Sequence, residues 1–172
     1  MERSVKELIE ALSGNDGMAR KRARETLVLI GEPVAEHVRS LLGSPEKRVR
    51  WEAAKTLAAM VYPPSVEALA QLLGDPLSEI RWLAGDGLIN LGPRSVGPVL
   101  RSLLGGAPSS GHLEAAHRVL GRLSADNEVL AEMVGPVVEV LATDSPDFGV
   151  VATKAGRALS DLDRITGRLP AL

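Results

Sequence analysis

Two tryptophans have the side-chain type and the spacing that best suit recognition of a ligand. Trp51 follows Arg50, and Trp82 follows Arg81 at the same place in a second, similar segment. An indole beside a guanidinium can stack on a base or a peptide side chain. The sequence therefore predicts a candidate aromatic and basic surface at Arg50, Trp51, Arg81 and Trp82. Packing of each indole over a seam between helices is the alternative, and we favour it because large aromatic side chains usually act through their buried area.

The other residues that could do chemistry form no catalytic or metal-binding pattern. Cysteine is absent, which excludes a thiolate nucleophile or metal ligand. His112 and His117 are five residues apart and point to different sides of a helix, and His37 lies far from both. A metal site needs several ligands that converge, and no glycine-rich phosphate loop, G-x-S-x-G turn or pair of carboxylates is evident. We therefore expect a protein that is not an enzyme, with no catalytic residues, metal or cofactor.

The segments that must position these side chains are copies of one another. Residues 49–60 recur 31 positions later as residues 80–91, and a copied segment predicts a copied structural unit. Apolar residues lie four before, four after and seven after an alanine in each copy, with His112 as an exception, and these offsets share one helical face. The alanine anchors are Ala23, Ala53, Ala84, Ala116 and Ala155. Each copy therefore predicts an amphipathic helix with a small residue at its waist, where another helix can approach closely.

A second helix is predicted after each of the first four copies. Residues 34–42, 66–73, 96–104 and 134–142 share one apolar frame. Gly-Ser-Pro, Gly-Asp-Pro and Asp-Ser-Pro separate the copies, and each places a proline at the first helical position after a good N-cap. The predicted fold class is therefore all-α, an α-solenoid of stacked antiparallel helix pairs.

These patterns predict a single domain, residues 1–172, with about four repeats and a half-repeat at each end. The predicted units are a capping helix at 4–14, repeats at 17–43, 45–74, 76–105 and 109–143, and a C-terminal half-repeat at 146–172. Between its two helices the fourth repeat has six residues more than the third. We expect this insertion, near 125–133, to form a lengthened turn or an added helical turn capped by Asp126, and to be a place where a function specific to this protein could lie.

The motifs RVRWEAAKTLA and EIRWLAGDGLINLG, each followed by a Leu-Leu helix, resemble HEAT repeats, especially the short bacterial type also called lyase HEAT-like repeats. The resemblance covers nearly the whole chain and is strongest over 45–104. In that family an arginine near the start of the first helix commonly meets an aspartate in the turn inside a repeat. Arg20, Arg50 and Arg81 occupy the arginine column, but the turns of this sequence lack the aspartate.

A second charged column lies two residues after each alanine anchor. It consists of Glu25, Lys55, Asp86, Arg118 and Arg157, and the sign of the charge alternates through the first four. If this column faces the neighbouring repeat, it predicts a row of ion pairs that sets the register. A solvated outer face is the alternative.

The resemblance implies a non-catalytic scaffold or adaptor that binds another protein or a peptide. The second helices are expected to line a concave face, and its exposed side chains are the predicted partner-binding residues: Glu36, Arg39, Gln71, Arg101 and Glu139. The N-terminus has no signal-peptide pattern and no apolar run is long enough for a membrane span. We therefore predict a cytoplasmic protein with no membrane partner, whose oligomeric state the sequence does not define.

Two other functions follow from the resemblance. One is nucleic-acid binding or base repair at the arginine and tryptophan positions, which the net charge of -2 and the mixed charges of the second helices argue against. The other is an accessory subunit of a cofactor-attaching lyase, suggested by the family name alone. An idealised designed array is a third alternative, and Gly85, Gly87 and Gly156 argue for a natural sequence because each costs about 1 kcal/mol relative to alanine inside a helix.

Overall fold

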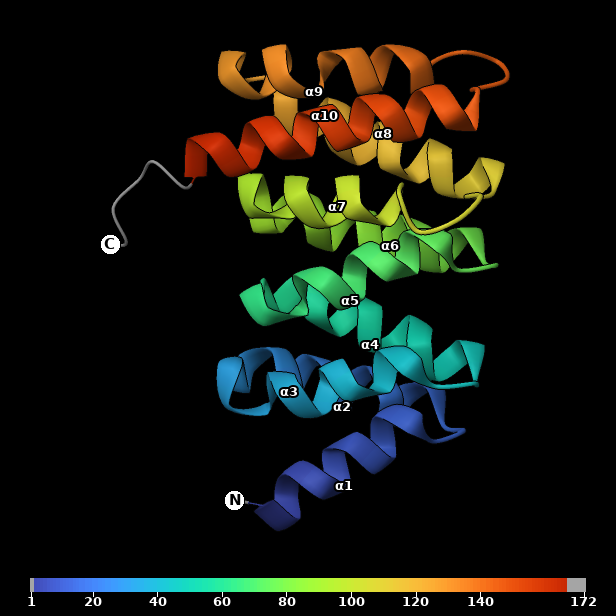
Figure 1. Cartoon of the computed structure of the whole chain (residues 1–172). Coiled ribbons are helices and arrows are strands. Elements are labelled where there is room, and N and C mark those ends of the chain that lie inside the picture. Colours follow the sequence, from blue (N-terminus) through green and yellow to red (C-terminus); the bar gives the residue numbers. More distant parts are fainter. Residues whose placement is uncertain (1, 167–172) are drawn as a thin grey trace.

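The chain folds into antiparallel helix pairs stacked along one axis, from α1 at one end to α9 and α10 at the other (Figure 1). The structure is a computed structural model that describes residues 2–166. The described residues contain α-helices and short 3-10 turns and no strand. The predicted all-α solenoid is therefore confirmed. None of the described helices is both long enough and apolar enough to span a membrane.

The first helices of the repeats form one continuous row. They are α2 (Gly17–Ile30), α4 (Lys47–Met60), α6 (Ser78–Leu91) and α8 (Ser110–Ser124). Each packs on the next, and the alanine anchors of all four are buried. Gly87 extends this close approach, since a Cβ there would lie 3.3 Å from the Cα of Ala58 and 3.0 Å from a methyl carbon of Leu69. A larger residue at position 87 would push α6 away from α4 and α5.

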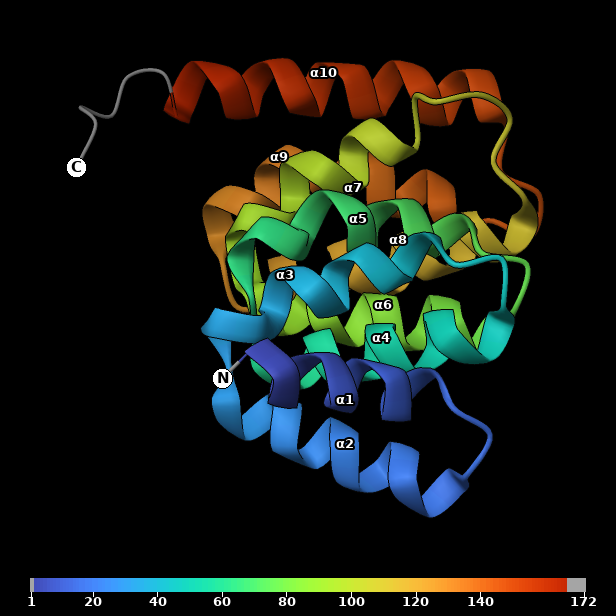
Figure 2. The same cartoon turned by 90° about the horizontal axis from the view of Figure 1, so that it is seen from below.

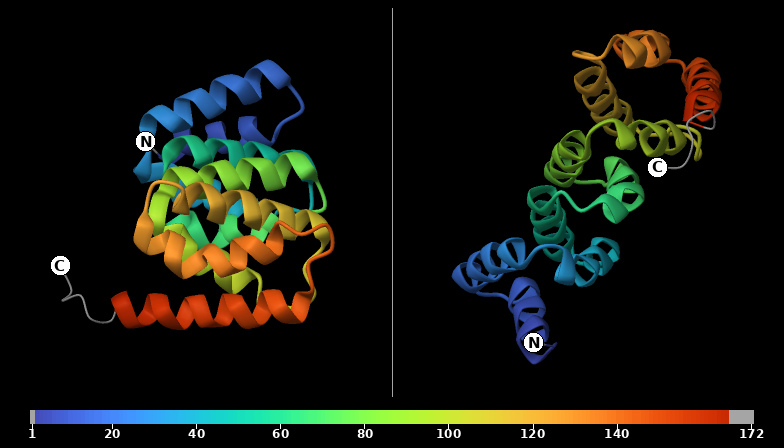
Figure 3. Two further views of the ribbon diagram at one scale, coloured as in Figure 1. Left: turned by 90° about the horizontal axis from the view of Figure 1, so that it is seen from above. Right: turned by 90° about the vertical axis from the view of Figure 1, so that its left-hand side faces the viewer.

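The second helices form a parallel row of shorter elements, as the right-hand view of Figure 3 shows. They are α1 (Glu2–Ser13), α3 (Glu32–Ser40), α5 (Val66–Gln71) and α7 (Val96–Ser102). Short 3-10 turns extend them at one end or the other, at Leu41–Gly43, Pro63–Ser65, Leu72–Gly74 and Gly92–Ser95. Their apolar residues, among them Val38, Leu69 and Val99, are buried against the first row.

The insertion in the fourth repeat is an added helical turn. Helix α9 (Glu128–Leu141) is twice as long as α7, and the side chain of Asn127 caps it by accepting a hydrogen bond from the backbone N–H of Leu130 at 3.0 Å. The predicted cap, Asp126, is wrong by one residue. Asn127 has the extended backbone that an N-cap requires, with φ -141° and ψ 101°, and a short side-chain acceptor.

The last helix closes the end of the stack instead of lengthening the first row. Helix α10 (Phe148–Thr166) packs against α9 and α7, so that α7, α8, α9 and α10 surround a common core (Figure 3, right). Figure 2, which views the stack from one end, shows α10 along the outer side of the second helices. Gly97 on α7 gives Leu162 room, because a Cβ at 97 would lie 3.3 Å from a Leu162 methyl carbon. Residues 167–172 of the predicted half-repeat 146–172 lie outside the described residues.

Candidate functional site

The three arginines of the predicted column share one anchoring arrangement. In Arg20, Arg50 and Arg81, the Nη1 group donates to two backbone carbonyls of the loop just before its own helix. Arg20 donates to the carbonyls of Gly14 (3.1 Å) and Asn15 (2.9 Å). Arg50 donates to those of Ser44 (2.9 Å) and Pro45 (3.1 Å), and Arg81 to those of Asp75 (2.9 Å) and Pro76 (3.1 Å). These bonds satisfy loop carbonyls that no helix uses. They also hold each guanidinium in the same orientation relative to its repeat.

Two of these arginines bind a carboxylate of the following repeat through the rest of the guanidinium. Arg20 donates from Nε to Glu52 at 3.0 Å, and Arg50 donates to both oxygens of Asp75, from Nε at 2.7 Å and from Nη2 at 3.4 Å. Glu52 and Asp75 are only 4% and 7% exposed. The family's ladder therefore exists in another form, with the acid supplied by the next repeat instead of the turn inside the same repeat. Sequence reasoning missed both acids because it searched only the turns.

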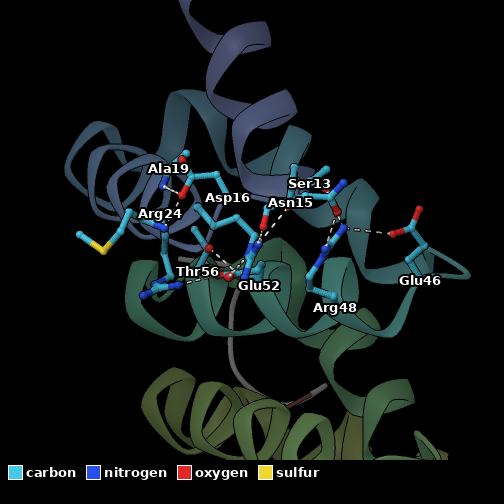
Figure 4. Close-up of polar contacts among 12 residues, drawn as sticks. Ser13, Asn15, Asp16, Ala19, Arg24, Glu46, Arg48, Glu52 and Thr56 are labelled. Carbon is cyan, nitrogen blue, oxygen red and sulfur yellow. Dashed lines mark hydrogen bonds and ion pairs between the residues drawn. The ribbon is translucent and has the colours of Figure 1, made fainter.

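The N-terminal seam contains additional arginine contacts. Figure 4 shows Arg24 directed at Glu52 across the seam between α2 and α4, so that this carboxylate bridges two arginines. In the same view, Arg48 reaches the side chain of Asn15 at 2.7 Å and the backbone carbonyl of Ser13 at 3.3 Å. These bonds tie the end of α1 to the start of α4.

Arg81 has the same anchor, but within the described part of the chain it forms no ion pair with a carboxylate. The positions equivalent to Glu52 and Asp75 in the next repeat are Ala115 and Ala107, counted from the alanine anchor. Both hydrogen bonds of the Arg81 guanidinium to described residues go from Nη1 to backbone carbonyls. Its Nε and Nη2 atoms lie over Gly111 at the start of α8, 2.9 and 2.6 Å from where a Cβ would stand. Gly111 thus provides the space in which this guanidinium lies.

A pocket of about 270 Å³ opens beside Arg81, between α6 and α8; we call it the Arg81 pocket. It is lined by Ser78, Arg81, Trp82, Gly111, Glu114, Ala115, His117 and Arg118. Trp82 is 58% exposed, and the guanidinium carbon of Arg118 lies 3.9 Å from the centre of its ring. Arg118 also donates to the backbone carbonyl of Trp82 at 2.7 Å and to Asp86 at 2.8 Å. A cation over an indole face is attractive, so Arg118 fixes one face of Trp82.

Gly85 makes this stacking arrangement feasible. A Cβ at position 85 would lie 2.3 Å from Nη2 of Arg118, because the Arg118 side chain crosses α6 directly over this residue. Gly111 on α8 gives the same room to the side chain of Arg81, which comes from α6. The sequence showed Gly85 only as a cost to helix stability, and the structure supplies its reason.

Trp51 lies in a different environment from Trp82. It is half-buried against the core, with the Lys55 ammonium 4.5 Å and the Arg24 guanidinium carbon 5.9 Å from its ring centre. The two tryptophans line one shallow depression of about 340 Å³ with Ser78, Glu79 and Leu83. Of the predicted aromatic and basic surface, Trp51, Trp82 and Arg81 thus border neighbouring hollows of the first-helix row. Arg50 is instead held by Asp75.

The predicted residues of the second helices are exposed or half-buried, and three of them are engaged in ion pairs. Glu36 accepts a hydrogen bond from Nε of Arg39 at 2.8 Å, which holds the pKa of Glu36 below its ordinary value. Arg101 on α7 pairs with Glu67 on α5, whereas Gln71 and Glu139 are exposed. Their role in binding stays a prediction.

The alternating charge column forms one ion pair between helices, from Asp86 to Arg118. Glu25 pairs with Lys21 of its own helix and Lys55 lies over Trp51, so these two residues set no register between α2 and α4. The alternation of sign therefore predicted an inter-repeat contact at one seam. At the seam between α2 and α4, the partner of Glu25 and the partner of Lys55 each lie one turn away on the same helix, within reach of the charge.

His112 is a buried residue of α8 and lines a hollow other than the Arg81 pocket, together with Gly74 and Ser102. Its Nε2 lies 3.0 Å from the Ser102 hydroxyl oxygen, and its Nδ1 faces Gly74. Burial, and secondarily the charge of Arg81, lowers the pKa of His112 from 6.5 and so favours the neutral ring. Among residues 2–166, no group of three or more His, Asp or Glu side chains could hold a metal ion.

The fold and these ladders define a helical-repeat protein. Residues 5–86 match the family described as HEAT repeats, which confirms the predicted resemblance over this part of the chain. A search of curated proteins found no match.

Solved structures give the same fold. A chain of the complex of CpcE and CpcF of phycocyanin lyase from Nostoc sp. PCC7120 has a TM-score of 0.62 and 21% identity, over 92% of this chain and 99% of that chain. An engineered protein has a TM-score of 0.52 and 22% identity, over 92% and 79% of the two chains. Another engineered protein has a TM-score of 0.50 and 20% identity, over 93% and 81%. At these identities the similarity establishes the fold alone.

Proposed function

We propose that this chain is a non-catalytic scaffold that binds another protein or a peptide, with Trp82 at the centre of the contact. The observation that carries the proposal is the exposure of Trp82, 58%, in a ring held in place by Arg118 beside the Arg81 pocket. Tryptophan and arginine dominate the energetics of many protein interfaces, most often as rigid anchors next to a pocket. A stacked helical array provides an extended surface around such an anchor.

The second-helix residues are the competing contact surface. Glu36 with Arg39, and Glu67 with Arg101, already form ion pairs on that face. A partner would have to replace these pairs, and exposed ion pairs contribute little net affinity. The surface around Trp82 offers apolar area that becomes buried on binding. We therefore place the main contact on the first helices.

The alternatives from the sequence have less support. Nucleic-acid binding at the arginine and tryptophan positions would need Arg50, whose guanidinium is occupied by Asp75 and two loop carbonyls. The chain also carries a net charge of -2. An accessory role in a cofactor-attaching lyase is supported by the likeness to a chain of a phycocyanin lyase complex, at the level of the fold.

Affinity capture from an extract of the source cells, with quantitative mass spectrometry, tests the proposal. The bait would be the unmodified chain, Trp82→Ala, and a double charge reversal, Arg39→Glu with Arg101→Glu. We expect proteins that bind the unmodified chain to be lost from Trp82→Ala and retained by the double reversal. The opposite pattern would move the contact to the second helices. Absence of any specific protein in all captures would contradict the scaffold function, and a lyase subunit among the captured proteins would favour the accessory role.

A further inference from the structure

The guanidinium of Arg81 presents an edge that its two equivalents use to hold a carboxylate. Arg20, Arg50 and Arg81 share the same Nη1 anchor to the loop before their helix. In Arg20 and Arg50 the Nε side binds Glu52 and Asp75, while in Arg81 it lines the Arg81 pocket. We infer that Arg81 binds an acidic side chain, Asp or Glu, of the partner protein. This inference rests on the proposed function and names the chemistry that the partner presents.

None of residues 2–166 supplies the acid at this position. Glu52 and Asp75, the acids that pair with Arg20 and Arg50, correspond here to Ala115 and Ala107. Asp86 is paired with Arg118. Glu114 is exposed at the rim of the pocket and forms no ion pair with Arg81 among the described contacts. Of the two arginines that line the pocket, Arg118 is paired with Asp86, and Arg81 forms no ion pair with a described residue, so its charge is available to a partner's carboxylate.

The size and charge of the pocket favour a carboxylate side chain over a larger or more highly charged group. About 270 Å³ accommodates one side chain and is smaller than the usual site for a cofactor or drug-sized ligand. Glu114 would repel the double charge of a phosphate more strongly than the single charge of a carboxylate. The same guanidinium edge holds a carboxylate twice elsewhere in this chain, with Nε–oxygen distances of 3.0 and 2.7 Å.

The geometry also prepares Arg81 for a two-pronged contact. The parallel Nε and Nη2 donors of arginine match the two oxygens of a carboxylate. The loop carbonyls of Asp75 and Pro76 fix Nη1, and Gly111 leaves room for the guanidinium to lie flat across α8. A side chain that is already ordered loses less conformational entropy on binding. Trp82 also lines the pocket, so the methylene groups of a partner glutamate can contact its side chain at the same time.

The test uses short random peptides displayed on phage and selected on the unmodified chain, with a chain carrying Trp82→Ala used to remove other binders. A selected peptide is then synthesised and its affinity measured by fluorescence anisotropy. We expect the selected peptides to share an Asp or Glu. Arg81→Lys, which keeps the charge and loses the fork, should weaken binding about tenfold. Replacing the peptide's acid by its amide should weaken binding similarly, and combining both changes should add little.

Two further variants separate a binding role from a structural one. Gly111→Ala keeps Arg81 but puts a Cβ within 3 Å of its guanidinium, so it should weaken binding as Arg81→Lys does. Arg164→Lys, at an arginine of α10 that pairs with Asp161 and does not line the Arg81 pocket, should leave affinity unchanged. Peptides that need Trp82 but tolerate Arg81→Lys and carry no acid would overturn the carboxylate inference while the proposed surface stands. Failure to select any peptide that depends on Trp82 would overturn both.

Discussion

The seam between α4 and α6 and the seam between α6 and α8 are built from equivalent parts, and they differ in what the arginine binds. At the first seam Arg50 reaches Asp75, which is 7% exposed, so charge and hydrogen bonds are satisfied within the chain. At the second, Arg81 keeps the same backbone anchor but lies over Gly111 and lines a pocket with Ala115. The same repeat position thus forms a buried ion pair in one copy and lines a pocket in the next.

The largest expected effect is the loss of the acid at the closed seam. Asp75→Ala should lower the free energy of unfolding by about 3 kcal/mol, because Arg50 then retains a mostly buried charge without a partner. The backbone N–H of Leu77 also loses its acceptor, now 3.0 Å away. Arg81→Ala should cost only about 1 kcal/mol, since it removes hydrogen bonds to carbonyls alone. Urea unfolding followed by circular dichroism measures both, and equal losses would mean that the two seams are equally closed.

The tryptophans give a second matched pair. Trp51→Ala should destabilise by about 2 kcal/mol, because the half-buried indole packs against the core and leaves a gap when removed. Trp82→Ala should cost less than about 1 kcal/mol, as expected for an exposed residue. The same unfolding experiment compares them. A larger loss for Trp82 would show that its ring serves packing and would remove the reason for placing a partner there.

The open seam can be closed by restoring the acid. Ala107→Asp places a carboxylate at the position equivalent to Asp75 and should raise stability by up to about 1 kcal/mol. It should also weaken binding of an acidic peptide, because the new carboxylate competes for Arg81. Ala107→Asn is the control of similar size without the charge, and we expect it to change neither quantity. If the two variants behave alike, Ala107 is not equivalent to Asp75 in space.

Gly85 and Gly156 both lie inside helices but differ in what an added methyl group would meet. A Cβ at Gly156 on α10 meets no atom within 4 Å, so Gly156→Ala should stabilise the protein by about 0.5–1 kcal/mol through helix propensity. Gly85→Ala should gain less, because the new Cβ displaces Arg118 from Asp86 and from the ring of Trp82. Tryptophan fluorescence should change in Gly85→Ala and remain constant in Gly156→Ala. A full gain in stability at position 85 would mean that the Arg118 contacts contribute nothing.

The smallest expected effect is a pH dependence from His112. The folded-state pKa of His112 lies below 6.5, so the unfolded chain binds this proton first and stability falls as the pH drops below about 6.5. Arg81, Ser102 and Gly74 face the ring. In Arg81→Met the folded pKa should rise and the pH dependence weaken, which NMR titration and unfolding at several pH values can follow. His112→Gln is the control, and it should remove this component of the pH dependence.

The sequence predicted the helices well because their period is a local property. The alanine anchors and their apolar neighbours at fixed offsets identified the faces that pack, and all four anchors of the first helices are buried. The position of α9 was less well predicted, since Asp126 and Asn127 are both acceptable caps and only the backbone chooses between them.

The candidate site was predicted only in part. Arg81 and Trp82 were named from their spacing, but nothing in the local sequence distinguished Arg81 from Arg50. The difference depends on which residues of the following repeat come within reach of a guanidinium. Asp75, the acid that pairs with Arg50, comes from a loop, whereas Glu52, the acid that pairs with Arg20, comes from a helix. The two acids also lie at different distances along the chain from their arginines. That no carboxylate of the described residues pairs with Arg81 becomes visible only in the three-dimensional structure.

The sequence by itself determined the repeat, the two helices of each unit, and the small residues at which neighbouring units meet. These features depend on periodicity and side-chain size, which are readable along the chain. Tertiary structure decided that α10 closes onto α7, that Gly85 and Gly111 lie beneath arginines, and that Arg81 faces a pocket while Arg50 faces Asp75. Hydrogen bonds and ion pairs act over about 3 Å, so their partners are fixed only by how the repeats stack.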